Sequence, residues 1–231
     1  MEENYHRNSG RYLITPKSIA NASVVLSETV SNFDGTEKAP TVTVVSGNKT
    51  LSPNTEYTVT YRNNKNIGTA TVTVNGIGNY TGTISKNFTI QAKKGSTFTV
   101  GAYQYKITSS TEVAFSGLKK STTKKVTIPA EVKIGGKKFK VTSIANKALK
   151  GKNVTSVTIG KNVKTIGTSA FEKCSKLTKI TVKGTALTKV GKKAFKGINA
   201  KAKIKVPKKK LSAYQKLMKN KGQSATVKIT K

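Results

Sequence analysis

The sequence predicts a mainly β protein of two domains, in which a β-sandwich is followed by a short solenoid of repeats that ends in a capping helix. Three observations support this fold class. Valine, isoleucine and tyrosine alternate with threonine in the first part of the chain, and an apolar pattern recurs every 22 to 24 residues in the second part. The net charge also changes abruptly, from +2 over residues 1–92 to +32 over residues 93–231, which hold 35 lysines and three acids. Such a step in composition marks a domain boundary.

Three segments are expected from this division. Residues 1–17 form a flexible N-terminal segment, residues 18–92 form the β-sandwich domain, and residues 93–231 form the repeat domain. The stretch QAKKGS, residues 91–96, serves as the linker.

The first domain shows the two-residue period of half-buried strands. TVTVV (residues 41–45), YTVTY (57–61), TATVTV (69–74) and TISKNFTI (83–90) each place one set of apolar side chains on one face. Clusters of glycine, asparagine and proline between them supply the turns that hairpins need. Six or so short strands of this kind predict a β-sandwich.

A family resemblance supports this interpretation. EYTVTYRNNKNIGTATVTVNGIGNYTGTISKNFTI (residues 56–90) resembles the small Ig-like repeats of Gram-positive cell-surface proteins, and the resemblance covers most of residues 18–91. It implies an Ig-like domain that acts as a spacer, and an extracellular location.

The second domain contains three consecutive copies of one pattern, at residues 141–162, 163–186 and 187–210. Each copy begins with an apolar pair three residues apart, continues with a small and a bulky residue, and ends in a short strand. A period of 20 to 29 residues with one strand per repeat is typical of a leucine-rich-repeat solenoid. One repeat cannot bury its own apolar face, so neighbouring repeats must stack.

The repeats also carry a recognisable motif. AFEKCSKLTKITV (residues 170–182), together with VKTIG (163–167), resembles the BspA-like class of leucine-rich repeats, and the resemblance spans residues 126–231. This class occurs mainly in bacterial and some protist surface proteins, and it often has a cysteine at the position of Cys174. The chain departs from the class in having few repeats, which leaves little concave surface for a large ligand.

Both ends of a solenoid need covering. Strands within residues 97–117 and 124–141 are expected to cover the N-terminal end, with Gly135-Gly136 as a tight turn. After Pro207, apolar residues recur at helical spacing, so residues 211–220 are predicted to form an amphipathic capping helix. ATVKIT, residues 225–230, is expected to add a last strand.

No arrangement typical of an enzyme is present in the sequence. The chain has one histidine, one cysteine and nine acids, and no two acids of the second domain lie within a short motif. Cys174 has no nearby histidine to activate it and is interpreted as a buried apolar residue, while His6 is interpreted as solvated. The sequence therefore predicts no catalytic residues, no metal site and no cofactor.

The N-terminus does not have the pattern of a signal peptide, because Glu2 and Glu3 precede and no apolar run follows. No stretch approaches the ~18 apolar residues that a transmembrane helix requires. Since both resemblances are to surface proteins, we expect an extracellular or cell-surface location, a fragment of a longer secreted protein, and a monomer.

Lysine and threonine dominate the outward positions of the predicted repeat strands. If the strands stack in register, about 4.8 Å apart, these residues form a ladder on one face. The candidate ligand-binding residues are Lys125, Thr127, Thr158, Lys179, Thr181, Lys203, Lys205 and Lys228, with Ser156 in the same row. A solvated surface that only confers solubility is an equal alternative.

The function that these observations favour is a non-catalytic bacterial cell-surface module for adhesion. Its expected partner is an anionic polymer, a glycan or a host matrix protein, and the sequence does not choose among them. Nucleic-acid binding is an alternative that the charge allows, but residues 93–231 contain no arginine to read or stack on bases. A purely structural, wall-associated unit is a third possibility.

Overall fold

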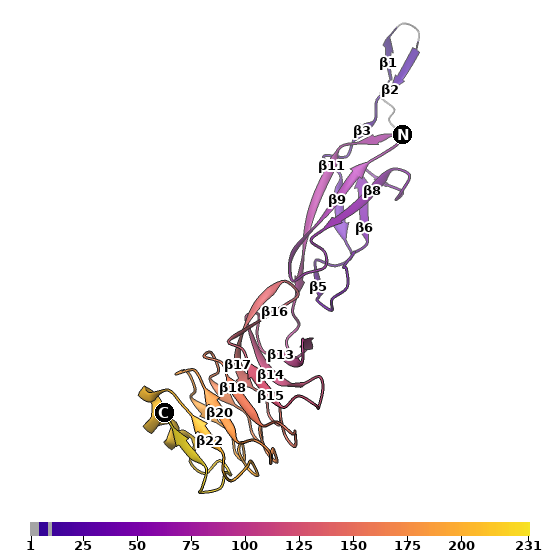
Figure 1. Cartoon of the computed structure of the whole chain (residues 1–231). Helices are drawn as coiled ribbons and strands as arrows, with labels where there is room; N and C mark the ends of the chain where they lie inside the picture. The colour runs from indigo at the N-terminus through magenta and orange to yellow at the C-terminus, as the bar shows by residue number, and fades with distance from the viewer. Residues whose placement is uncertain (1–4, 9–10) are drawn as a thin grey trace. The chain divides into compact units, whose positions relative to one another are not determined.

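The computed structural model describes residues 5–8 and 11–231, and the side chains from Thr15 onward (Figure 1). The chain divides after Gln91 into two compact units. Ahead of the first core, β1 (Tyr5–Asn8) and β2 (Arg11–Ile14) pair as antiparallel strands.

The first unit consists mainly of two sheets. One has the order β5-β11-β9-β8 and the other the order β4-β6-β7, while β3 and β10 form a short parallel pair. The strand bounds are β3 (Lys17–Ser18), β4 (Ser23–Leu26), β5 (Val30–Asn32), β6 (Val42–Ser46), β7 (Lys49–Thr50), β8 (Tyr57–Arg62), β9 (Gly68–Gly76), β10 (Tyr80–Thr81) and β11 (Thr83–Gln91).

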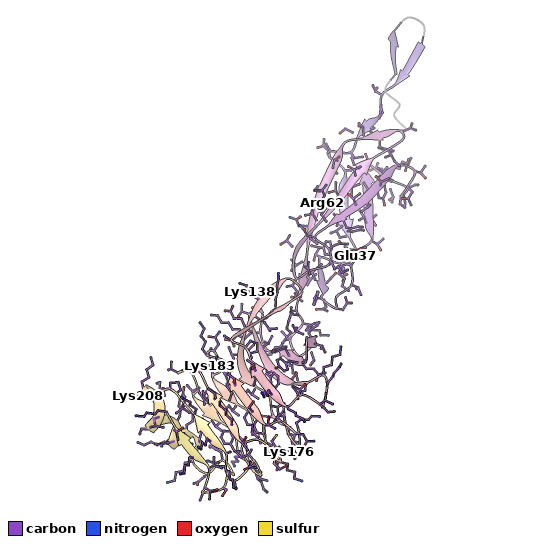
Figure 2. All side chains as sticks on the ribbon, viewed as in Figure 1. Glu37, Arg62, Lys138, Lys176, Lys183 and Lys208 are labelled. Atoms are coloured by element: carbon purple, nitrogen blue, oxygen red, sulfur yellow. The ribbon has the colours of Figure 1, made fainter. Side chains whose placement is uncertain are left out.

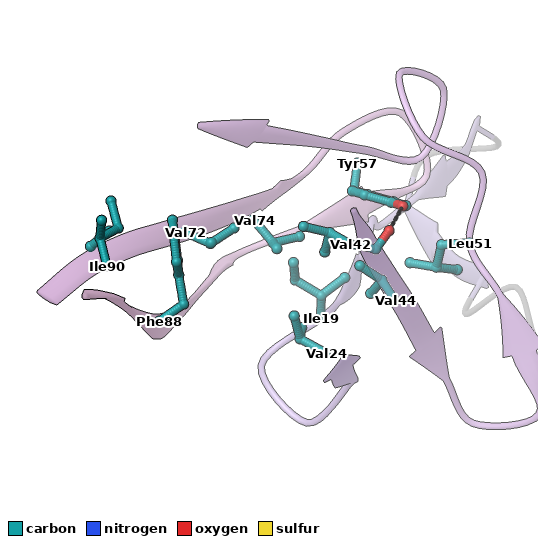
Figure 3. Packing of buried hydrophobic residues seen from close by; sticks show 11 residues of the cluster. Ile19, Val24, Val42, Val44, Leu51, Tyr57, Val72, Val74, Phe88 and Ile90 are labelled. Atoms are coloured by element: carbon teal, nitrogen blue, oxygen red, sulfur yellow. Dashed lines mark hydrogen bonds between the residues drawn. The ribbon is translucent and has the colours of Figure 1, made fainter. Parts of the chain in front are cut away.

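The alternating apolar residues of these strands form one buried cluster (Figure 3). Val72 and Val74 of β9 contribute to it from the larger sheet, and Val42 and Val44 of β6 contribute from the smaller one. The Tyr57 hydroxyl donates a hydrogen bond of 2.8 Å to the Val42 carbonyl, which satisfies a polar group inside this cluster. The two-residue period of the sequence therefore identifies the inward faces, as expected. The assignment of this unit to the Ig-like class stays a prediction.

The second unit contains a parallel sheet of five short strands, one from each successive turn of the chain. These strands are β15 (Lys125–Ile128), β18 (Ser156–Ile159), β20 (Lys179–Val182), β22 (Lys203–Lys205) and β23 (Lys228–Thr230). Figure 1 shows β15, β18, β20 and β22 side by side in chain order. Their central inward residues are in register: Val126, Val157, Ile180 and Ile204 are buried, and Ile229 is half-buried.

A second sheet of this unit has the order β12-β13-β14-β17-β19-β21, with β16 paired to β17. Its strands are β12 (Thr97–Val100), β13 (Tyr103–Ile107), β14 (Glu112–Leu118), β16 (Glu131–Ile134), β17 (Lys137–Ile144), β19 (Thr165–Ile166) and β21 (Lys189–Val190). β14, β17, β19 and β21 pair in parallel, whereas β16 is antiparallel to β17. Phe115, Ile144, Ile166 and Val190 lie in one buried row. The second residue of each apolar pair (Ile144, Ile166 and Val190) therefore lies in a second strand of its repeat, which the sequence pattern did not predict.

Backbone hydrogen bonds also join the turns that connect the two strands of each repeat. Leu149 N donates to Ala170 O at 2.8 Å, and Phe171 N donates to Ala194 O at 2.9 Å. The rings of Phe171 and Phe195 stack with centroids 5.8 Å apart. The small and bulky dipeptides thus occupy equivalent places in successive layers. Gly167 lies in a tight part of this stack, where a Cβ atom would meet the Ala145 carbonyl carbon at 2.6 Å.

The predicted capping helix is present as α1 (Leu211–Met218), which follows a short 3-10 helix at Lys208–Lys210. Tyr214 and Met218 are its buried residues. The Tyr214 hydroxyl accepts a hydrogen bond of 3.0 Å from Leu187 N and donates one of 3.1 Å to Gly184 O. These bonds fix the helix to the junction between the second and third repeats. The closure of the repeats into a solenoid stays a prediction.

Candidate functional site

The outward face of the five-stranded sheet brings the predicted ladder residues together. Each strand of this sheet alternates between a buried and an outward residue, because successive side chains of a strand point to opposite faces. Since the strands are parallel and in register, each outward position forms a row across the sheet. Two rows result, and we call them the lysine row and the threonine row.

The lysine row consists of Lys125, Ser156, Lys179, Lys203 and Lys228. Its four lysines are exposed, and the serine is half-buried. Lys179, Lys203 and Lys228 lie on three adjacent strands, so their backbones follow one another at about 4.8 Å. Like charges in register on neighbouring strands repel one another. This row therefore concentrates positive charge in a line across the strands.

The threonine row consists of Thr127, Thr158, Thr181, Lys205 and Thr230. Thr158 and Thr181 are half-buried, and the other three residues are exposed. Lys205 adds a fifth ammonium group, next to Lys203 on the same strand. The sequence predicted every member of this row except Thr230, which lies beyond the last outward residue that the repeat pattern identified.

The acids of the second unit lie on other faces. Glu112 of β14 accepts hydrogen bonds from the Lys164 ammonium at 3.2 Å and from the Thr142 hydroxyl at 3.1 Å. Glu172, which is 8% exposed, forms an ion pair of 2.8 Å with Lys150 of the preceding repeat. The hydrogen bond from Lys150 lowers the pKa of Glu172 below its usual value. Among the described residues, the strands that carry the two rows hold no acid, so no carboxylate neutralises this face from within.

Lysine side chains are not confined to the two rows. Figure 2 shows them extending from the second unit in several directions, with Lys138, Lys176, Lys183 and Lys208 labelled as examples. The two rows differ from a row such as Ser143, Thr165 and Lys189 of the other sheet in that they extend over five strands and hold five lysines. Regularity and unmixed sign of charge make this face the best candidate for a binding site.

Cys174 is placed as the sequence predicted. The side chain is fully buried, and its thiol donates a hydrogen bond of 2.8 Å to the Leu149 carbonyl. Burial raises the pKa of the thiol to about 11, so the thiolate that nucleophilic chemistry requires is disfavoured. The expectation for His6 concerns a side chain outside the described part.

Two further searches cover only the described residues. No group of three or more histidine, cysteine, aspartate or glutamate side chains gathers there in a way that could hold a metal ion. No helix of that part of the chain has the length and apolar character needed to cross a membrane.

Comparison with known proteins identifies the repeats. Residues 142–231 match the family described as "BspA type Leucine rich repeat region", in six copies. The sequence matches no curated protein.

Solved structures similar to the chain include several bacterial proteins. A leucine-rich cell surface protein from Faecalibacterium prausnitzii is 21% identical, with a TM-score of 0.43, over 50% of this chain and 38% of that protein. A leucine-rich repeat protein from Bacteroides capillosus is 22% identical, with a TM-score of 0.45, over 59% of this chain and 99% of that protein. One from Bacteroides ovatus is 26% identical, with a TM-score of 0.38, over 48% and 38%.

The extent of these matches differs. The chain spans 38% of the Faecalibacterium protein and nearly all of the Bacteroides capillosus protein. The family match begins within β17 and includes β18, β20, β22 and β23, so it contains most of both rows. Residues 142–231, less than half of the chain, are thus similar to leucine-rich-repeat regions of the BspA type.

Proposed function

We propose that this chain is a non-catalytic cell-surface module whose repeat unit binds an anionic polymer on the outward face of the five-stranded sheet. The first unit, with its near-neutral charge, acts as a spacer. The observation that carries the proposal is the register of the parallel sheet, which aligns Lys179, Lys203 and Lys228 on adjacent strands.

The location of the acids supports the same face. Two of the three acids in the second unit are paired with lysines elsewhere, as Lys164–Glu112 and Lys150–Glu172. Each of these ion pairs cancels positive charge locally. The two rows hold five lysines and no acid, so none of their charge is cancelled within the face, and a polymer with regularly spaced anionic groups complements it.

If the lysines only confer solubility, the loss of any three of them should weaken anion binding equally. This expectation provides the test. In one variant of the full chain, Lys179, Lys203 and Lys205 are replaced by glutamine. The matched control replaces Lys192, Lys193 and Lys196, which are also exposed, so both variants lose three positive charges. Binding to immobilised polygalacturonate and to inorganic polyphosphate is measured over a series of salt concentrations.

The row variant is expected to lose most of the affinity for at least one of the two probes. The plot of log affinity against log salt concentration should become shallower for this variant, by about two to three in the magnitude of the slope, because fewer counterions are released. The control variant should lose much less. Equal losses in the two variants would show that net charge alone attracts the polymer and that this face has no special role.

A further inference from the structure

The two rows present different chemistry along parallel lines. Neighbouring outward residues of one strand, such as Lys179 and Thr181, are two positions apart, so the rows are separated by about 6.6 Å. One row offers ammonium groups on long side chains, and the other offers mostly hydroxyl groups on short ones. The short side chains of the threonine row therefore form the floor of this face, and the long, charged side chains of the lysine row stand higher along one side of it.

The hydroxyl groups of the threonine row are available to a ligand. In the part of the chain that the structure describes, the hydroxyls of Thr127, Thr158, Thr181 and Thr230 make no hydrogen bond to another protein group. Other threonines of the chain behave differently. On β9, Thr71 donates to Asn87 at 3.0 Å, and Thr73 shares a hydrogen bond of 3.3 Å with Ser85 of β11.

The chemistry of the floor distinguishes between classes of polyanion. A threonine hydroxyl both donates and accepts hydrogen bonds, and its methyl group offers a small apolar contact. A sugar ring matches both, because it carries neutral hydroxyls that donate and accept and C–H groups that can lie on the methyls. A polyphosphate has only acceptor oxygens and no ring to cover the floor.

Resting on the proposed function, we propose that the ligand is an acidic polysaccharide that lies across the strands. Its rings contact the threonine row, and its carboxylate or sulfate groups face the lysine row. A segment that reaches from Lys125 to Lys228 crosses four strand spacings, about 19 Å, and so passes all members of both rows. The floor is uninterrupted at Thr127, Thr158 and Thr181, and Lys205 provides an additional anion contact at the β22 end.

The test separates the hydroxyls from the charges. One variant of the full chain carries Thr158→Val and Thr181→Val, which keep the side-chain shape and the charge but remove two hydroxyls. Its matched control carries Thr71→Val and Thr73→Val on β9. A third variant carries Lys179→Gln and Lys203→Gln. Each is titrated with polygalacturonate and with inorganic polyphosphate at equal concentrations of negative charge.

The expected results differ for the two probes. The Thr158/Thr181 variant should bind polygalacturonate about five-fold more weakly or worse, because two hydrogen bonds are lost, and should bind polyphosphate as the unmodified chain does. The lysine variant should bind polygalacturonate more weakly, and the β9 control should match the unmodified chain.

Several results would overturn the inference. If the Thr158/Thr181 variant binds polygalacturonate normally, or loses equal affinity for both probes, the threonine row does not select a polysaccharide, although the lysine row can still bind anions. If the unmodified chain binds polyphosphate and not polygalacturonate, the ligand class is wrong. If the lysine variant binds both probes normally, or the unmodified chain binds neither, the proposed function itself fails.

Discussion

The four-stranded sheet of the first unit and the five-stranded sheet of the second unit both have outward faces rich in threonine, but only the first pairs these polar groups with one another. On β9 and β11, which run antiparallel, most opposing residues differ, and hydrogen bonds form between complementary partners such as Thr83 and Asn75, at 2.9 Å. On the five-stranded parallel sheet, the repeat places the same kind of residue beside itself, so Thr158 lies next to Thr181 and Lys179 next to Lys203.

This difference shows what a sequence repeat does to a surface. An antiparallel pair can match donors with acceptors and positive with negative charges, and it thereby satisfies itself. In-register stacking of repeats instead multiplies one chemistry along a line. Such a line is costly for charges, which repel, but it is well suited to a polymer that repeats its own groups.

The largest effect on the difference between the two sheets is expected from a substitution that prevents the repeats from stacking. In Gly167→Ala the new Cβ would meet backbone atoms of Ala145 and Asn146, both at 2.6 Å. Backbone atoms cannot move aside cheaply, so the second unit should lose about 3 kcal/mol of stability. Hydrogen exchange followed by mass spectrometry on the full chain measures each unit separately, and peptides from the first unit should not change.

Gly151→Ala is the control for this substitution. Gly151 has a φ of +69°, and a Cβ there would meet nothing within 4 Å. Only backbone strain applies, and it should cost about 1 kcal/mol. If Gly151→Ala destabilised the second unit as much as Gly167→Ala, close stacking at Gly167 would not be the cause.

A matched pair of tyrosines compares the two units directly. Tyr214→Phe removes a hydroxyl that serves two backbone groups, Leu187 N and Gly184 O, whereas Tyr57→Phe removes one that serves only Val42 O. We expect a loss of about 2 kcal/mol in the second unit for Tyr214→Phe and about 1 kcal/mol in the first unit for Tyr57→Phe. The same exchange experiment measures both values, and a reversed order would contradict the role of Tyr214 in fixing the helix.

Glu172→Gln tests the ion pair within the repeats. The pKa of Glu172 is lowered in the folded state by its hydrogen bond from Lys150. The folded state therefore binds the proton less readily than the unfolded state, and the carboxylate stabilises the fold above its ordinary pKa of 4.5. That contribution is lost as the pH falls through the folded-state pKa. The variant should have a lower melting temperature at pH 7, and its difference from the unmodified chain should disappear in acid. A difference that is independent of pH would exclude an electrostatic origin.

The smallest expected effect concerns the lysine row in the absence of ligand. Lys203 lies between Lys179 and Lys228, so Lys203→Gln removes its charge repulsion with both of these lysines. The substitution Lys203→Gln should stabilise the second unit by about 0.5 kcal/mol at low salt, and by less when salt screens the charges. Thermal unfolding at low and high salt measures this. Destabilisation at low salt would show that the side chain packs favourably and that repulsion in the row is negligible.

The sequence alone predicted the inward residues of the repeats and the outward rows, because both follow from the two-residue period of a strand. It did not predict β19 and β21, since two-residue strands such as Thr165–Ile166 show no alternation. Nor did it predict the parallel pairing of β14 with β17, because β14 lies outside the three repeats and its partner is fixed only by tertiary packing.

The ion pairs illustrate an intermediate case. Lys150 and Glu172 occupy the same position in successive repeats, so their contact follows once the repeats are stacked in register. Glu112 and Lys164 are 52 residues apart, and Glu112 precedes the repeats. No spacing rule connects them, and only the folded arrangement of β14 beside the first repeat reveals the contact.

The buried cysteine of the middle repeat provides a natural reporter. Cys174 is the only sulfhydryl in the chain and is shielded in the folded state, where burial raises its pKa to about 11. An alkylating reagent can therefore modify it only when that layer opens. The rate of labelling therefore measures how often the interior opens locally around Cys174, without any engineered probe. A bound polymer that bridges successive layers would slow this opening. The rate at which Cys174 is alkylated would then decrease, which reports ligand binding.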